Sequence, residues 1–297
     1  MLVTALLVDA CKKANVDDVR RYIREGADVN QRLDSRPNLG WAPIHFACQL
    51  ESSVILAILL ENGADPNLLT NDGFPALNIA CNAAECSKEM VQMLLEHGAD
   101  TNVFDSNGLA SLHDACHSRN AAIVAVLLKY GANVNFPTRD DVHPLHIASF
   151  KGEEQIIQIL LKHGADTNVL DSNGMAPLLH PCDSQNAAAV AALLGHGANV
   201  NLPTNGRGTN ANLPKMDGSY PLHIACDVGV VHVKETVVRM LLEHGADVDA
   251  IWQTDGSTPL HIACLSHHRN HDLGNLVDLL LDQQPNICLL DSSGLCM

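Results

Sequence analysis

The sequence has few aromatic residues and no long apolar run. Phe, Trp and Tyr together make up 3% of the 297 residues, although 46% of the residues are hydrophobic. Because large rings are scarce, we expect a core of many small contacts between Ala, Leu, Val and Ile on stacked helices. The apolar stretch at residues 1–8 is too short to span a membrane and has no basic segment before it. We therefore expect neither a membrane segment nor a targeting signal.

Basic residues are also scarce, since 18 Lys and Arg face 34 Asp and Glu and give a formal net charge of −16 at pH 7. An acidic chain repels phosphate backbones and anionic lipid, and it attracts basic partners. We expect a protein partner with a basic face, no nucleic acid and no membrane. Ten cysteines without a secretory signal favour a reducing compartment, the cytoplasm or the nucleus.

Motifs for catalysis do not stand out from the sequence. We find no phosphate-binding glycine loop, no Ser-His-Asp order and no paired carboxylates at a characteristic spacing. The acidic residues are expected in turns, helix caps and solvated faces. The sequence therefore predicts a protein that is not an enzyme and needs no cofactor.

What the chain does contain is a repeat. A Gly-Ala-Asp or Gly-Ala-Asn tail recurs seven times, beginning at Gly26, Gly63, Gly98, Gly131, Gly164, Gly197 and Gly245. Up to Gly197 the copies lie 33 to 37 residues apart. This period indicates a repeat array, in which each copy contacts its neighbours and no single central core forms.

The copy at residues 140–168 shows how one repeat folds. Pro144 suits the first turn of a short helix, and a second apolar stripe at residues 156–161 ends at Gly164 in the position of a left-handed helix cap. The polar stretch that follows contains Asn173-Gly174, a turn signal, and reads as a hairpin-like finger. Each copy is thus predicted to be a finger and two helices, and neighbouring copies must stack to bury both stripes.

The run from Ser257 to Ala263 and the related runs at residues 221–225 and 144–148, each with a downstream Gly-Ala-Asp tail, resemble the ankyrin repeat. The resemblance covers nearly all of residues 1–297 and implies an all-α ankyrin-repeat solenoid in one array. It also implies that protein partners bind on a concave surface of fingers and first helices. We expect a monomer. The eight approximate copies are 1–30, 38–67, 72–102, 107–135, 140–168, 173–201, 217–249 and 255–288.

Three departures from the repeat are informative. Pro181 falls about one turn into the first helix of the sixth copy, and Gly195 lies in its second helix. Because both residues weaken helices, this copy is expected to be the least stable. A Gly, Pro and Asn-rich loop at residues 202–216 carries Arg207 and is either a binding element or a disordered spacer. Residues 291–297 look like the opening of a ninth copy, as expected of a fragment or of a poorly capped array.

Histidine is abundant, with 16 residues, but most of it follows the repeat. Five histidines share the slot after the first-helix Leu or Ile, where we expect hydrogen bonds that tie a finger to its helix; they are His45, His113, His146, His223 and His261. Four more precede a Gly-Ala tail, namely His97, His163, His196 and His244. These nine histidines are predicted to have structural roles and not to be metal ligands.

Cysteine raises two further questions. Seven of the ten cysteines share one first-helix slot, where neighbours about 10 Å apart cannot form disulfides and act as small buried hydrophobes. In the eighth copy Cys264, His267 and His271 would share one helix face, which a zinc site could use. The alternative is an exposed extension between two helices, and we favour it, so no metal site is expected.

Candidate binding residues lie at the finger tips, two residues past the tail Asn, where ankyrin repeats usually show a polar residue. Here the tips are apolar, at Leu69, Phe104, Pro137, Leu170 and, in a longer finger, Ile251 with Trp252 beside it. Such a row is a candidate binding stripe, unless the fingers pack the tips against each other. A second row on the first helices holds Gln49, Asn82, His117, Phe150, Asp183, Asp227 and Leu265. With Arg207 of the long loop, we select Leu69, Phe104, Phe150, Leu170, Ile251 and Trp252 as protein-binding residues.

The tails suggest a modification. Asn67, Asn102, Asn135, Asn168 and Asn201 each end a tail and follow a Leu by eight residues. This setting is similar to that in which ankyrin-repeat asparagines are hydroxylated by an asparaginyl hydroxylase. Hydrogen bonds within the finger are the structural alternative.

Three readings of function remain open beside a simple scaffold. The array is similar to those of ubiquitin-ligase substrate receptors that carry a SOCS box, although no such box is visible before Met297. It also suits a regulatory ankyrin segment of a longer enzyme or channel. A zinc-dependent activity at residues 264–272 is the third.

Overall fold

The computed structural model describes residues 2–34, 38–83, 87–204, 218–227, 231–267, 274–289 and 291. All regular elements in these residues are helices, apart from one isolated bridge between Leu69 and Pro75 within a finger. The prediction of an all-α fold is therefore confirmed.

The chain divides into two compact units, Met1–Arg139 and Asp140–Met297. The first contains α1 (Leu2–Lys12), α2 (Val16–Arg24), α3 (Pro43–Gln49), α4 (Ser53–Glu61), α5 (Ala76–Asn82), α6 (Lys88–Glu96), α7 (Ser111–His117) and α8 (Ala121–Lys129). The second contains α9 (Pro144–Lys151), α10 (Glu154–Lys162), α11 (Leu179–Asp183), α12 (Ala187–Gly195), α13 (Pro221–Asp227), α14 (Val231–Glu243), α15 (Pro259–His267) and α16 (Gly274–Leu281).

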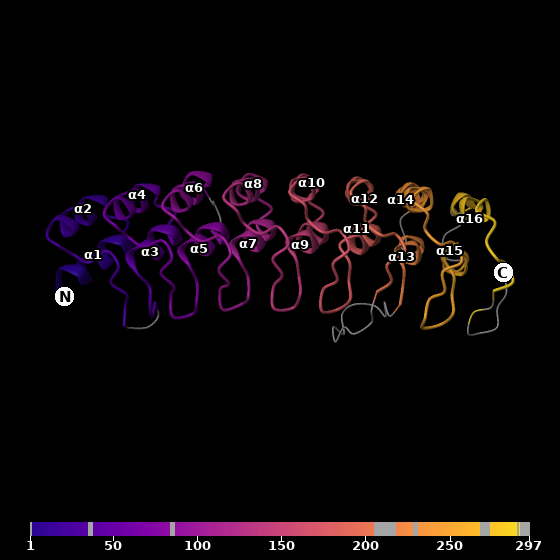
Figure 1. The fold of residues 1–297 in the computed structure, drawn as a ribbon, viewed down its shortest axis with the longest axis horizontal. Helices are drawn as coiled ribbons and strands as arrows, with labels where there is room; N and C mark the ends of the chain where they lie inside the picture. Colours follow the sequence, from indigo (N-terminus) through magenta and orange to yellow (C-terminus); the bar gives the residue numbers. More distant parts are fainter. Residues whose placement is uncertain are drawn as a thin grey trace. The chain divides into compact units, whose positions relative to one another are not determined.

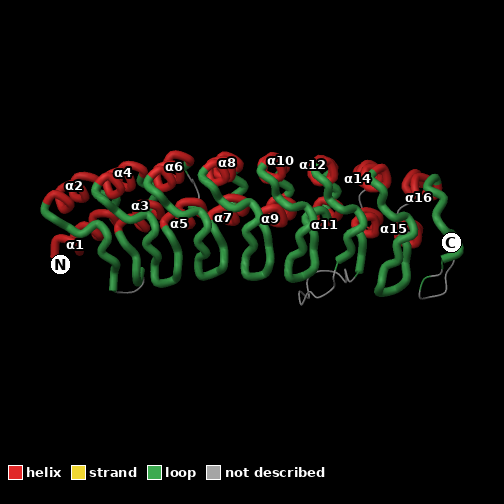
Figure 2. The backbone as a smooth tube through the Cα atoms, in the orientation of Figure 1, coloured by secondary structure: helices red, strands yellow, loops and turns green. Residues whose placement is uncertain are grey.

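Within each unit the helices form two layers. In the first unit the odd-numbered helices lie in one row and the even-numbered helices in another, and α3 packs on α5 and α5 on α7 (Figure 1). The second unit repeats this order from α9 to α16. The loops extend as fingers from the side of the odd-numbered row (Figure 2). The finger, helix and helix order predicted for each copy is confirmed.

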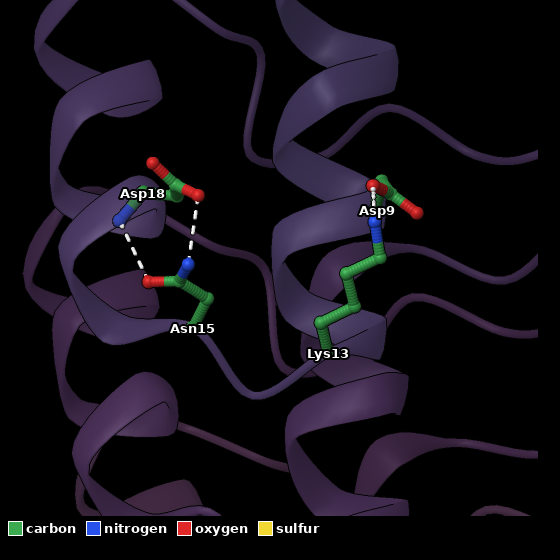
Figure 3. Close-up of polar contacts among 4 residues, drawn as sticks. All are labelled: Asp9, Lys13, Asn15 and Asp18. Atoms are coloured by element: carbon green, nitrogen blue, oxygen red, sulfur yellow. Dashed lines mark hydrogen bonds and ion pairs between the residues drawn. The ribbon is translucent and has the colours of Figure 1, made fainter.

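The second helices begin and end as their sequences direct. Five of them have an N-cap side chain that accepts a hydrogen bond from the N–H three residues on, at Asn15, Ser52, Ser87, Asn120 and Asn186. Figure 3 shows the first of these caps, in which Asn15 also donates to Asp18. At the other end the seven tail glycines have φ between +83° and +89°, a conformation that suits glycine and closes the helix.

The repeat histidines take the structural role that their slot predicts. His45 Nδ1 accepts a hydrogen bond of 2.8 Å from the Ala42 N–H, and its Nε2 lies 2.9 Å from the Leu68 carbonyl oxygen of the next finger. Because Nδ1 accepts, the ring proton sits on Nε2 and can donate to that carbonyl. The other four histidines of this slot also accept through Nδ1 from a backbone N–H. Burial lowers the pKa of His146 and of His223 to about 4.

The sixth copy differs from the others at its first helix. A turn at residues 177–178 precedes α11, which has five residues, whereas α9 has eight. Pro181 lies inside α11 and has no N–H to donate, which accounts for the short helix. The lower stability of this copy stays a prediction. Arg207, most of the long loop and residues 292–297 lie outside the described residues.

Candidate protein-binding surface

The predicted finger tips are partly exposed. Leu69, Phe104 and Ile251 are 38%, 40% and 50% exposed, while Leu170 and Trp252 are half-buried. Neighbouring positions in the same fingers are buried, such as Thr70 and Asp105. The tips therefore present apolar surface that the fold does not cover.

The Phe104 tip also packs on a residue of the neighbouring finger. The rings of Phe104 and Phe136, on neighbouring fingers of the first unit, lie 4.4 Å apart between centroids and are inclined by 11°, which is a stacked pair. The alternative that fingers pack their tips against each other thus applies here in part. Sequence reasoning selected Phe104 and missed Phe136, because nothing in the sequence indicates which ring lies beside it.

The residues of the second predicted row lie at the surface of their units. All seven of its residues are exposed: Gln49, Asn82, His117, Phe150, Asp183, Asp227 and Leu265. Phe150 at 64% and Leu265 at 56% are the most exposed of the large apolar side chains in the described part of the chain. The rings of His180 and Phe150 pack in a T-shaped arrangement, with centroids 5.0 Å apart. The first helices thus place two large apolar side chains in water.

A groove lies on this side of the first unit, with a volume of about 650 Å³. Its walls come from α3, α5 and α7 and from the fingers before α3, α5 and α7. Two aromatic residues, Trp41 and Phe74, line it together with the acidic residues Asp105 and Asp114.

Sequence reasoning did not select Asp114, although a signal was present. Asp114 stands in the first-helix slot that holds Ile147, Ile224 and Ile262 in three other copies. The residue is 6% exposed, and burial, with a smaller contribution from the negative charge of Asp105, raises the pKa of its carboxyl to about 7. A carboxylate in an apolar slot is the kind of departure that marks a functional site.

The tail asparagines connect neighbouring repeats. Asn102 Nδ2 donates to the Gly131 carbonyl at 3.3 Å, and its Oδ1 accepts from the Asn133 N–H at 2.9 Å. Asn67, Asn168 and Asn201 repeat the same pair of contacts with the following tail. The side-chain hydrogen bonds of these asparagines therefore run to the next repeat. Within their own finger, the backbone N–H groups of the same residues donate to the side chain two residues earlier. Hydroxylation of these residues stays a prediction.

The cysteines and histidines of the described residues gather no metal site, since no three of the possible ligands lie close enough together to hold an ion. Six of the seven slot cysteines are buried and Cys264 is half-buried, with none paired in a disulfide. The zinc candidate at residues 264–272 lies mostly outside the described residues. Among the described helices none is long and apolar enough to cross a bilayer.

This architecture of stacked helix pairs with projecting fingers defines an ankyrin-repeat protein. A profile of ankyrin repeats, three copies long, matches residues 7–105, 55–138, 112–204 and 202–291. The chain therefore belongs to the ankyrin-repeat family. Ankyrin repeats are protein-interaction modules and typically have no catalytic activity.

Individual relatives match short parts of the chain. The mitochondrial disaggregase of Bos taurus is 41% identical over 64 residues, which are 22% of this chain and 9% of that protein. The 2-5A-dependent ribonuclease of Homo sapiens is 37% identical over 68 residues, 23% of this chain and 9% of the ribonuclease. Protein phosphatase 1 regulatory subunit 27 of Homo sapiens is 38% identical over 69 residues, 23% of this chain and 42% of that subunit. The chain thus covers less than half of each of these relatives.

Proposed function

We propose that this chain is a non-enzymatic scaffold that holds a protein partner on its fingers and first helices. The observation that carries the proposal is the exposure of Phe150 at 64%, although Leu145 and Ala148 of the same helix are almost completely buried. An exposed large ring beside a finger row with further apolar tips is typical of a recognition surface.

Charge indicates the kind of partner. The net charge of −16 favours association with a basic protein face and disfavours nucleic acid. The first-helix row itself includes Asp183 and Asp227, both exposed. We propose a partner that combines apolar anchors with Lys or Arg, bound by a monomer of this chain in the cytoplasm or nucleus.

A regulatory role within a larger assembly is the second candidate. One relative is named a regulatory subunit of a phosphatase, and another is a ribonuclease of which the matched part is 9%. Ankyrin segments thus occur in proteins with regulatory and enzymatic names. A substrate receptor of a ubiquitin ligase, or the ankyrin segment of a longer enzyme or channel, is compatible with the same binding surface.

Affinity capture with the full chain as bait tests the scaffold. We compare the wild type with the double variant Phe150→Ala and Ile251→Ala, which truncates two exposed apolar side chains of the predicted rows. The matched control is Val54→Ala with Leu281→Ala, which truncates side chains exposed by 51% and 43% on the second helices α4 and α16.

The expected result is a partner that the wild type and the control capture and that the row variant loses. For the purified partner, calorimetry should then show at least about tenfold weaker binding to the row variant. A partner retained equally by all three proteins, or lost equally by both variants, would contradict binding on this surface.

A further inference from the structure

The groove of the first unit is lined by both acidic and aromatic residues. Asp105 and Asp114 are its acidic residues, and Trp41 and Phe74 are its aromatic residues. The Asp105 carboxylate is held in place by the N–H groups of Asn107 and Leu109, at 2.8 and 2.9 Å from Oδ1. Its orientation is therefore fixed by its own finger before any ligand arrives.

Asp114 is the unusual member of the groove. The residue is 6% exposed, and its carboxyl accepts no hydrogen bond from any residue that the structure describes. Its backbone carbonyl is satisfied by Ser118, and only the carboxyl group lacks a partner. A carboxyl at such a buried position without a hydrogen-bond partner is destabilising when it ionises, so hydrophobic packing alone does not account for it.

The other members of this slot show that the fold does not need an acid there. Ile147, Ile224 and Ile262 occupy it in three other copies, and Ile147 and Ile224 are buried on helices of the second unit. The repeat therefore does not require an acid in this slot, and residues that bind a ligand often depart from the pattern of their fold in this way.

We infer that this groove is a subsite for one arginine side chain of the protein partner, with Asp114 as its counter-ion. The inference rests on the proposed function, because the arginine belongs to the bound protein. A guanidinium is planar, presents several N–H donors and stacks on aromatic rings, so it matches a groove lined by acidic and aromatic residues. A lysine offers a single strongly hydrated charge and uses the rings less well.

The volume suits this occupant. A space of about 650 Å³ is larger than one side chain requires, and it also admits the backbone on either side of the arginine. The exposed residues His117 and Gln49 at the groove then face the neighbouring residues of the partner. The arginine supplies a positively charged partner for the Asp114 carboxylate, and the flanking segment of the bound protein supplies contact area.

N-acetyl-arginine methylamide is the probe, titrated into the isotope-labelled full chain and followed by NMR. We expect saturable shifts of the Trp41 indole N–H and of backbone amides at Asp105 and Asp114. The lysine analogue should bind at least about threefold more weakly, and the citrulline analogue, which has the same shape without charge, should give no saturable shift.

Asp114→Asn removes the charge with little change of shape and should weaken binding of the arginine probe at least about tenfold. The matched control is Asp9→Asn, the same change in the same slot of the first repeat. There the carboxylate is 54% exposed and pairs with Lys13 at 2.7 Å (Figure 3). The control should bind the probe as the wild type does.

Three results would overturn the inference: no saturable shift in the groove, equal binding of the citrulline analogue, or equal binding by Asp114→Asn. A captured partner that is lost by the Phe150→Ala and Ile251→Ala variant but binds Asp114→Asn normally would also overturn it, while leaving the scaffold intact. Because the probe reads the groove directly, failure of partner capture does not affect this result.

Discussion

Asn67 and Asp100 are joined across neighbouring repeats, since the backbone N–H of Asp100 donates to Asn67 Oδ1 at 2.8 Å. The Nδ2 of the same amide donates to the Gly98 carbonyl at 2.9 Å. The side chain of one tail thus satisfies a donor and an acceptor of the next tail. An amide can do both, whereas a carboxylate can only accept, which is a reason for asparagine to recur at this position.

Asn67→Asp should therefore destabilise the first unit. The new carboxylate keeps the acceptor for Asp100 but faces the Gly98 carbonyl without a proton to donate, and we expect a loss of about 1–3 kcal/mol in unfolding free energy. Urea unfolding of the full chain measures it. Asn120→Asp is the control, because Asn120 acts as an N-cap acceptor for the Ile123 N–H, a role that aspartate performs equally well. An equal loss in both variants would contradict the argument.

Hydroxylation of the tails is a separate prediction. Asn67, Asn102, Asn168 and Asn201 are exposed at the fingers, and Asn135 is half-buried. We expect mass spectrometry of the protein from cells to find a mass increase of one oxygen atom on at least one of these five residues. Because the amides of the four exposed residues bond to the next repeat, the enzyme must first displace the finger. Peptides that cover all five without such a species would reject the prediction.

The buried histidines predict a loss of stability in acid. Burial lowers the pKa of His146 to about 4 from 6.5. Below pH 6.5 the unfolded chain therefore binds protons that the folded chain does not, so unfolding free energy falls as the pH drops from 6.5 to 4. The most that His146 can contribute is about 3 kcal/mol.

His146→Asn tests this effect, because Asn78 already fills the same slot in the third copy and donates to the Leu109 carbonyl. Urea unfolding of this variant should change less between pH 6.5 and 4 than that of the wild type. Adding His223→Asn should reduce the change again, since burial also lowers the pKa of His223 to about 4. An unchanged slope in the double variant would show that these rings are not the cause.

The sequence predicted the repeat well because each element depends on local signals. Pro144 at a helix start and Gly164 at a helix end follow from backbone conformation alone, and both are found as expected. The stack of Phe104 on Phe136 and the bonds from Asn67 to the next tail were not predicted. They depend on the distance between neighbouring fingers, which a residue's own surroundings in the sequence do not determine.

The groove shows the same limit. Asp114 was visible in the sequence as an acid in a slot for Ile, but only the structure places it near Asp105 in a groove that Trp41 also lines. A departure from the repeat pattern marks an unusual residue in the sequence. Only the packing around that residue shows which groups it contacts.

The Phe104 tip is predicted to contribute to partner binding beyond its effect on the fold. Phe104→Ala loses the stack on Phe136 and should cost about 0.5–1.5 kcal/mol of stability beyond the loss of buried area. Phe136→Ala loses the same stack and serves as the control for stability. In pull-down experiments Phe104→Ala combined with Trp252→Ala should abolish capture of the partner, whereas Phe136→Ala should reduce it less. Equal capture by all variants would reject the stripe.

Asp114 is predicted to lower the stability of the free protein at alkaline pH. Burial raises the pKa of its carboxyl from 3.8 to about 7, so the folded chain holds a proton that the unfolded chain releases. Stability therefore rises as the pH falls from above 7 toward 4, and above pH 7 the folded state must bear the buried charge. The largest penalty that this shift allows is about 4 kcal/mol.

Asp114→Asn should remove that penalty and unfold at higher urea concentration than the wild type at pH 8, with the difference shrinking toward pH 5. The titratable side chains that line the groove are Asp105, Asp114 and His117, so a His117→Gln background separates the imidazole from the carboxyl. Asp9→Asn, whose carboxylate is exposed and paired with Lys13, should show no such gain. Equal stability of Asp114→Asn and the wild type at pH 8 would mean that the carboxyl is already compensated within the free protein.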